Sequence, residues 1–501
     1  MGRKSGNLFA PSAAMRRLCI AALLLAACAT NPVTHKREFN IVSESQEIQM
    51  GEQAHSQVIR QFGVYDEKPE LNRLVDTIGH RIAGVSDRPN LQWHYTVIDT
   101  PMVNAMALPG GYIYITRGML ERINSEDELA GVLGHETTHV TARHAAVQMS
   151  RAQLAQFGLV LGSVIAGPQA TQNYGQLAQL GLSLLFLRYS RGQESQADLV
   201  GTEYTTRAHF NPIGVERMLV GLMRLDKNPS SGIERYFQSH PDPAKRIRDV
   251  RKKLQEIAAT NPAALAVEPK REPYIRLTDG LITGNSTERV VIRNGTIYDR
   301  DHGLILQAPA GWMPTTAEGA LFAMMPRGRR QNMAFVAQEI ENRELQGSDA
   351  QSAMRNQFQQ MGLQYAASRK TTTASGQQFV IDIWQGQTDN GTVTVETTQF
   401  PHGDHVAVLM FLTPSLSGYQ SPLGEILSRA VIDRARARAA EPARVHVGTV
   451  RAGESWGDIA RRATRNPADA ETIANLNGFD VKEPPRAGML VKLPEEIVRE
   501  E

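Results

Sequence analysis

Apolar and polar residues repeat along the first half of the chain with the period of a helix in some stretches and of a strand in others. Residues 44–62 and 70–82 carry apolar side chains at every third or fourth position, which predicts two amphipathic helices. Two strand-like runs, 92–98 and 112–116, lie on either side of Pro109-Gly110-Gly111, and we expect them to pair through this turn. Further helices are predicted at 195–208, 213–225 and 243–257.

Two very apolar stretches interrupt this helical region, at 154–166 and 177–187. Both are shorter than the roughly 18 residues that a membrane-spanning helix needs, and no other part of the chain reaches that length. Two interpretations remain open. The stretches are buried core helices, or they form a lid or membrane-contacting hairpin over an active site.

A different pattern begins after the Pro/Ala-rich linker expected at 258–273. Strand-like runs alternate with helical runs, which predicts an α+β domain over 274–438 without a catalytic cluster of its own. Its segment GLILQAPAGW (303–312) resembles PsbP-like domains. The strand-like runs are 289–292, 334–338, 379–384 and 405–412, and the helical runs are 350–361 and 423–437.

A short third unit, 445–494, contains GTVRAGESWGDIARRA, IANLNG and PRAGMLVKLP. These segments resemble the LysM module, a small β-α-α-β unit, and the resemblance implies binding to peptidoglycan. Trp456 stands where such modules more often have a smaller apolar residue. The alternative is a small spacer that binds no glycan.

The N-terminus resembles an export signal. Arg16 and Arg17 precede the short apolar run 18–27, and we expect residues 1–28 to act as a signal peptide. The sequence Leu25-Ala26-Ala27-Cys28 resembles a bacterial lipobox, which implies a lipid anchor on Cys28. Ala29, in place of an aspartate, then implies the periplasmic side of the outer membrane of a Gram-negative bacterium. The alternative is a plain secretory signal.

Composition narrows the possible functions. The 501 residues are 41% hydrophobic and 21% charged, enough for two or three cores, and the net charge of +2 argues against a nucleic-acid partner. The two cysteines are Cys19 and Cys28, so the exported chain has no disulfide. Any metal site must therefore use histidines and carboxylates.

The segment GVLGHETTHVTARH (131–144) carries such residues at the spacing of a zinc site. Ser125 and Glu128 predict a capping box and a helix that begins near Glu126. His135 and His139 are four residues apart, so they share one helix face and reach one ion, with Glu136 beside it. This H-E-x-x-H arrangement supplies two zinc ligands and a general base.

A catalytic zinc needs a third protein ligand, and Glu194 in RGQESQADLVG is the best candidate. We expect it near the start of a helix, with Asp198 one turn later holding the outer nitrogen of a ligand histidine. The alternative for Glu194 is a solvated residue stabilised by the helix dipole.

Three segments, HETTHVTARH, ESQAD and NAMALPGGYIYITRGML, together resemble the gluzincin peptidases of the CAAX-prenyl-protease/HtpX group. They are most similar to the periplasmic branch of beta-barrel assembly-enhancing proteases. The resemblance covers about residues 40–255 and implies a mainly α zincin-type domain with a small β-sheet, here bounded at 38–258. It also implies one Zn²⁺ per chain on His135, His139 and Glu194, with Glu136 as general base.

The same resemblance implies two further elements of the site. Pro109 to Thr116 would form the active-site edge strand, so that Gly110, Gly111, Tyr112 and Tyr114 would bind an extended substrate. SHPDPAKRI (239–247) would bring His240 near the metal, either as an oxyanion donor or as a group that blocks the open zinc position. The alternative for His240 is a helix-cap histidine next to a proline. Unlike that branch, this chain shows no 34-residue helical repeats, so its partner contacts must differ.

The leading hypothesis is therefore a lipid-anchored zinc metalloendopeptidase that cleaves unfolded or misassembled envelope proteins in protein quality control. The rival is a non-catalytic envelope chaperone or peptidoglycan-tethered scaffold with a structural zinc. A zinc peptidoglycan hydrolase is a third possibility, and the peptidase motifs argue against it. His144 lies five residues after His139, which predicts a different helix face and a purely structural role.

Overall fold

The structure is a computed structural model. It describes residues 28–154, 188–225, 234–316, 320–326, 333–341, 350–360, 362–373, 375–388, 391–402, 405–414 and 423–497. The predicted export signal before Cys28 and the apolar stretches within 155–187 lie outside these residues. Among the helices described, none is both long enough and apolar enough to cross a bilayer.

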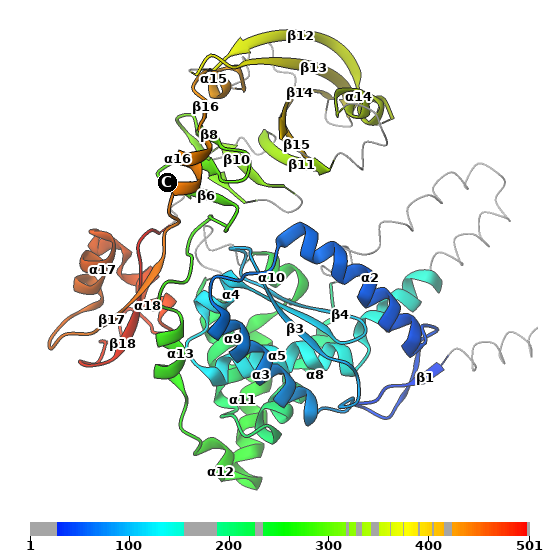
Figure 1. The fold of residues 1–501 in the computed structure, drawn as a ribbon. Coiled ribbons are helices and arrows are strands. Elements are labelled where there is room, and N and C mark those ends of the chain that lie inside the picture. Colours follow the sequence, from blue (N-terminus) through cyan, green and yellow to red (C-terminus); the bar gives the residue numbers. More distant parts are fainter. Residues whose placement is uncertain are drawn as a thin grey trace, which may run out of the picture.

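The N-terminal region packs helices around a small three-stranded sheet (Figure 1). A hairpin of β1 (Cys28–Thr30) and β2 (Arg37–Phe39) comes first. The sheet is formed by β3 (His94–Ile98), β4 (Ala105–Leu108) and β5 (Tyr112–Thr116). The helices are α2 (Glu44–Phe62), α3 (Pro69–Gly84), α4 (Arg117–Arg122), α5 (Glu126–Thr141), α8 (Arg191–Arg207), α9 (Ile213–Leu225), α10 (Glu234–Ser239) and α11 (Pro243–Thr260).

The sheet corrects one sequence-based prediction. The order is β3-β5-β4, and β3 and β5 pair in parallel rather than through a hairpin. The hairpin joins β5 to β4, a strand that the hydrophobic pattern did not reveal because Ala105 to Leu108 are all buried and show no alternation. The turn between them is Pro109-Gly110-Gly111, with φ of 83° at Gly110 and 98° at Gly111.

The segment expected to be a linker is partly helical and packs on the N-terminal region. α12 (Pro262–Leu265) and α13 (Arg271–Leu277) both lie beyond α11. The amide of Asn211 donates to the carbonyls of Leu265 and Val267, and Tyr274 belongs to the N-terminal hydrophobic core. These buried contacts explain why a stretch rich in proline and alanine is ordered here.

The middle region contains two antiparallel sheets. One has four strands in the order β16-β8-β7-β6, and the other has seven in the order β12-β13-β14-β15-β11-β10-β9. The helix predicted at 423–437 is interrupted, since α15 (Leu423–Ser428) and α16 (Arg434–Ala439) flank β16 (Val431–Ile432), which pairs with β8. The remaining elements are β6 (Val290–Arg293), β7 (Thr296–Asp299), β8 (Leu304–Gln307), β9 (Trp312–Thr315), β10 (Phe322–Pro326), β11 (Ala334–Glu341), α14 (Ala350–Gln360), β12 (Gln364–Thr372), β13 (Gln378–Thr388), β14 (Gly391–His402) and β15 (His405–Pro414).

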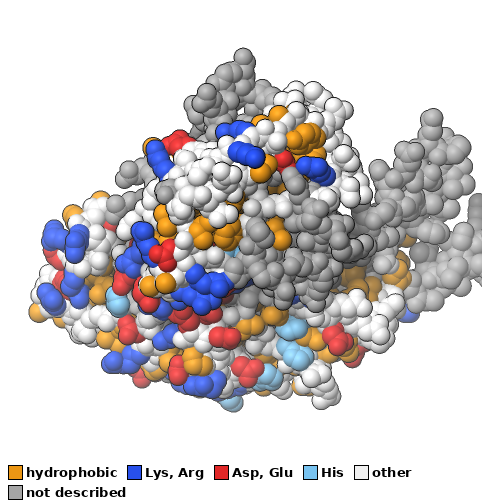
Figure 2. All heavy atoms as spheres, turned by 45° about the horizontal axis from the view of Figure 1, so that its top comes forward, with side chains coloured by type: hydrophobic (Ala, Val, Ile, Leu, Met, Phe, Trp, Pro, Cys, Tyr) orange, Lys and Arg blue, Asp and Glu red, His pale blue; other side chains and the backbone are white. Residues whose placement is uncertain are grey.

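The C-terminal unit packs against the N-terminal region rather than hanging free. It consists of β17 (Val445–Thr449), α17 (Trp456–Thr464), a 3₁₀ turn (Pro467–Asp469), α18 (Ala470–Leu476) and β18 (Leu490–Pro494), with β17 antiparallel to β18. The buried Lys492 ammonium donates to the carbonyls of Glu121 and Ile123 at the end of α4. On the face shown in Figure 2, Lys and Arg side chains are interspersed with Asp and Glu.

Candidate metal centre

The motif helix α5 begins where the sequence predicts, at Glu126. The Ser125 hydroxyl accepts a hydrogen bond from the Glu128 backbone N–H, which caps the helix. The reciprocal half of the predicted capping box differs, because the Glu128 carboxylate accepts from the N–H of Asn124 instead of Ser125. Every residue from Asp127 to Thr141 is buried, so α5 is the central helix of the domain.

A pair of glycines brings the third candidate ligand to this helix. A Cβ on Gly134 would lie 2.9 Å from the Gly201 carbonyl oxygen, and a Cβ on Gly201 would lie 2.9 Å from the Gly134 carbonyl carbon. The backbones of α5 and α8 therefore cross in close contact. Helix α8 begins at Arg191 under a Ser190 cap, earlier than predicted, which places Glu194 in the first turns and on the side facing α5.

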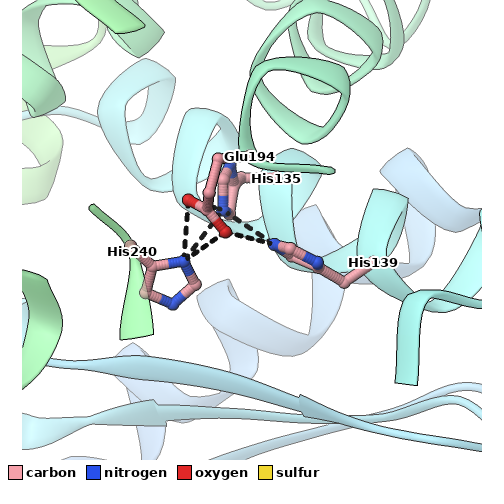
Figure 3. Close-up of side chains that lie close together, drawn as sticks. All are labelled: His135, His139, Glu194 and His240. Carbon is pink, nitrogen blue, oxygen red and sulfur yellow. Dashed lines mark hydrogen bonds and ion pairs between the residues drawn. The ribbon is translucent and has the colours of Figure 1, made fainter. Parts of the chain in front are cut away.

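Four side chains converge at this crossing: His135 and His139 from α5, Glu194 from α8, and His240 just after α10 (Figure 3). One donor atom from each lies within 4.8 Å of the other three. The two α5 imidazoles approach to 3.0 Å between their Nε2 atoms, and Glu194 Oε1 lies 3.5 Å from His139 Nε2. His240 Nδ1 lies 3.1 Å from each Glu194 oxygen and 3.3 Å from His135 Nε2.

This donor set fits zinc. Imidazole nitrogens and a carboxylate oxygen are ordinary zinc ligands, and all four residues are buried, so one dication would neutralise a carboxylate otherwise held away from water. Three of the four residues are the predicted ligands. His240 adds a fourth nitrogen at the place where a catalytic zinc site keeps an open position.

The predicted outer partner, Asp198, is in place. Its carboxylate oxygen lies 2.9 Å from His135 Nδ1, which directs the other ring nitrogen toward the cluster. Burial would raise the pKa of Asp198, but the Arg246 guanidinium outweighs it and holds this pKa well below its usual range. Asp198 is therefore a charged acceptor that orients the His135 ring.

Glu136 lies beside the four donors in the same buried space. Its Oε1 is 4.0 Å from His240 Nε2, and its Oε2 has no hydrogen-bond partner in the described part of the chain. Burial raises the pKa of this carboxyl, and the nearby His240 and His135 only partly oppose that effect. A buried carboxylate oxygen without a partner is costly unless a water or substrate proton satisfies it.

Sequence reasoning missed Arg246 and Tyr189. Arg246 donates to both oxygens of Asp198 and lies 3.2 Å from Glu194, so it links the third ligand to the outer shell. The Tyr189 ring stacks on His139 at 3.9 Å between centroids. Arg246 lies inside SHPDPAKRI, where the resemblance points only to the histidine, and no local pattern points to Tyr189.

The predicted helix face for His144 was wrong, because this residue contacts His139, and its structural role is to support that ring. Its Nδ1 lies 2.9 Å from His139 Nδ1, and its Nε2 lies 3.2 Å from the Gln196 amide oxygen. Helix α5 ends at Thr141 and Arg143 has a φ of 58°, so the chain turns back and the helical spacing argument does not apply. His144 is the outer partner of His139, as Asp198 is of His135.

The predicted substrate strand also needs correction. β5 is the central strand with neighbours on both sides, so Tyr112 and Tyr114 do not lie on a sheet edge. Tyr114 is fully buried, and its hydroxyl contacts His55 Nδ1 at 2.7 Å. The edge strands are β3 and β4, and Ala107 and Leu108 of β4 line a small cavity together with Gly110 and His139.

Comparison with known proteins agrees with this geometry. Residues 69–254 match peptidase family M48. The mitochondrial metalloendopeptidase OMA1 of Schizosaccharomyces pombe is 30% identical over 229 residues, which cover 45% of this chain and 66% of that protein. The beta-barrel assembly-enhancing proteases of Yersinia pestis and Escherichia coli K12 are 29% and 27% identical over 201 and 223 residues, covering 39% and 43% of this chain and 40% and 45% of theirs. This chain thus spans between two fifths and two thirds of these relatives.

Proposed function

Residues 69–254 match peptidase family M48, and from this premise we propose that the chain is a zinc-dependent metalloendopeptidase of the bacterial cell envelope. The observation that carries the proposal is the buried Glu136 carboxylate beside His135, His139 and Glu194, with one oxygen left without a partner. A structural zinc site needs no such carboxylate.

The chemistry follows from the positions of these groups. Zinc on His135, His139 and Glu194 would polarise a peptide carbonyl and lower the pKa of water there from about 15.7 towards about 7. Glu136 is placed to accept the water proton and later to deliver it to the leaving amine. The surroundings support this role, because burial raises the pKa of Glu136 and so makes this carboxylate a stronger proton acceptor.

His240 is best explained as an inhibitory residue that blocks the open zinc position. Its Nδ1 faces Glu194 and His135 rather than open space, so its ring fills the fourth position of the cluster. We propose that His240 keeps the enzyme inactive until substrate displaces its ring. Its alternative role as an oxyanion donor requires the ring to move away first, and a permanent fourth ligand would instead favour the non-catalytic scaffold.

The substrate strand is reassigned to β4. Because β4 is buried in this structure, an extended peptide would pair with this edge, past the cavity lined by Ala107, Leu108 and His139, only after the edge is uncovered. Two of the relatives are named for enhancing beta-barrel assembly. On that basis we propose unfolded or misassembled envelope proteins as substrates.

We propose a lipid anchor on Cys28 and a periplasmic location at the outer membrane, on the strength of the LAAC sequence. We also propose that the C-terminal unit is a LysM-like module that binds peptidoglycan. Its β-α-α-β order supports the proposal of a LysM-like module. The Trp456 indole donates to the Glu483 carbonyl inside the unit and is buried, so Trp456 serves packing rather than glycan contact.

The test compares wild type with Glu136→Gln for zinc content and for cleavage of an unfolded protein. Glu203→Gln, on the partly exposed side of α8, is the matched control. We expect about one zinc in all three proteins and cleavage lost only in Glu136→Gln. Zinc in all three without cleavage in any, even after His240→Ala, would contradict the peptidase proposal and support the scaffold.

A further inference from the structure

The segment around Cys28 combines three features that suit a membrane surface, and they lie close to the metal centre. We propose that the β1–β2 hairpin, the first turns of α2 and the end of the helical stretch 144–154 form a face that rests on an anionic phospholipid bilayer. This inference rests on the lipid anchor proposed for Cys28, and it adds how the enzyme is oriented on the membrane. We call these residues the anchor face.

The first feature is the short distance between Cys28 and the active site. Asn31 is buried, and its side-chain N–H donates to the carbonyl of Ala142 at 3.2 Å. Asn31 is three positions after Cys28, a reach of about 10 Å at most, and Ala142 lies about 4.5 Å along the helix from His139. An acyl chain on Cys28 would therefore hold His139 within about 20 Å of the bilayer surface.

The second feature is exposed apolar side chains. Ile41 and Leu154 are 45% and 47% exposed, and the Ile41 N–H donates to Ser150 Oγ, one helical turn before Leu154. Ile48, 39% exposed, has its Cα next to Gly110, which lines the small cavity beside His139. Transfer of exposed Ile and Leu side chains from water into the lipid interface is favourable.

The third feature is positive charge. Lys36 and Arg37 follow the turn of the β1–β2 hairpin, with Arg37 opposite Thr30, and Arg151 is exposed one turn before Leu154. The acids nearby are Glu44, which is paired with Arg88, the half-buried Glu38 opposite Ala29, and the exposed Glu52 one turn after Ile48. Basic side chains beside an acyl chain attract anionic headgroups, so charge and apolar area favour the same surface.

The orientation that results fits the rest of the molecule. Figure 1 shows β1 at the right end of the N-terminal region and the C-terminal unit at its left end. With the anchor face on the membrane, the C-terminal unit points away from the bilayer, toward the space that peptidoglycan occupies.

The test measures contact with lipid at single positions of the full acylated chain. Acylation consumes the Cys28 thiol and removal of the signal eliminates Cys19, so an introduced cysteine is the only thiol. Ile41→Cys and Leu154→Cys carry a fluorophore in phosphatidylethanolamine/phosphatidylglycerol vesicles that contain lipid-borne nitroxide quenchers. The matched controls are Tyr365→Cys and Val380→Cys, which replace equally exposed apolar residues of the middle region.

We expect strong quenching at 41 and 154 and little at 365 and 380. Equal quenching at all four positions, or none at 41 and 154, would overturn the anchor face. The mass of the N-terminal peptide and the peptidase assay in the same vesicles report acylation and catalysis separately. An unacylated Cys28 would also overturn the inference, whereas loss of peptidase activity alone would overturn only the proposed function.

A second measurement does not depend on the acyl chain. In the Cys28→Ser protein, we expect Ile41→Ser with Leu154→Ser to lower binding to phosphatidylglycerol vesicles several-fold. Tyr365→Ser with Val380→Ser should leave binding unchanged. Equal effects of the two pairs would overturn the proposal.

Discussion

Arg246 donates two hydrogen bonds of 2.7 Å each to the carboxylate of Asp198, and through it acts on His135. Bidentate pairs of this kind fix geometry as well as charge. Arg246 comes from α11 and Asp198 from α8, so the orientation of a ligand on α5 depends on three helices far apart in sequence. The candidate metal centre is therefore held by a network rather than by the motif helix alone.

Asp198→Asn should weaken zinc binding without unfolding the domain. The amide keeps the shape of the carboxylate but loses the charged acceptor for His135 Nδ1, and loss of such an outer partner typically costs about 10- to 100-fold in metal affinity. Competition with a chromogenic chelator measures the change. Asp249→Asn, which alters a partly exposed partner of Lys245 on α11, is the control and should keep wild-type affinity. An unchanged zinc affinity in Asp198→Asn would remove Asp198 from the site.

Gly201→Ala should destabilise the domain by about 1–3 kcal/mol, because the new methyl group meets the backbone of α5 at 2.9 Å and neither helix has room to move. Gly221→Ala, in α9, is the control. A Cβ there meets nothing within 4 Å, so the substitution should be neutral or stabilise by up to about 1 kcal/mol. Urea unfolding measures both. If the two variants had the same stability, the close helix crossing would be wrong.

His240→Ala should raise peptidase activity on an unfolded protein several-fold while zinc content stays near one per chain. The reason is that the ring occupies the fourth position of the donor cluster. His446→Ala, which removes an exposed histidine paired with Glu495 in the C-terminal unit, should leave activity unchanged. A fall in activity with zinc retained would assign His240 to oxyanion stabilisation instead.

The middle region should lose stability in alkali through His302. Burial alone would lower the pKa of this imidazole, but Asp299 at 2.7 Å and Glu339 at 3.5 Å outweigh burial and raise it to about 9. A folded pKa above the unfolded value means that protonated His302 stabilises the fold. The contribution is complete below about pH 6.5 and is lost as pH rises through about 9.

Thermal unfolding between pH 6 and pH 10 tests this expectation. We expect a decrease of about 3 kcal/mol in the stability of wild type over that range, and a flatter profile for His302→Gln. The same slope in both proteins would show that other groups cause the alkaline loss.

Several parts of the molecule follow from local sequence alone. The H-E-x-x-H spacing, the Ser125 cap and the amphipathic periods predicted α2, α3, α5 and α9 closely, because capping and helical periodicity are properties of neighbouring residues. The candidate ligands His135, His139 and Glu194 could be proposed for the same reason. Each lies in a short motif whose meaning does not depend on the rest of the chain.

Other parts depended on contacts between distant segments. The sequence contained β4 but no alternation to reveal it, and only the sheet decides that β5 is central and that β4 is an edge strand. His144 and Arg246 joined the site because a turn at Arg143 and the packing of α11 bring them back to it. Local sequence patterns determined which residues are candidates for the metal centre. Packing between helices decided which side chains surround those residues, because side-chain partners across a fold have no fixed spacing along the chain.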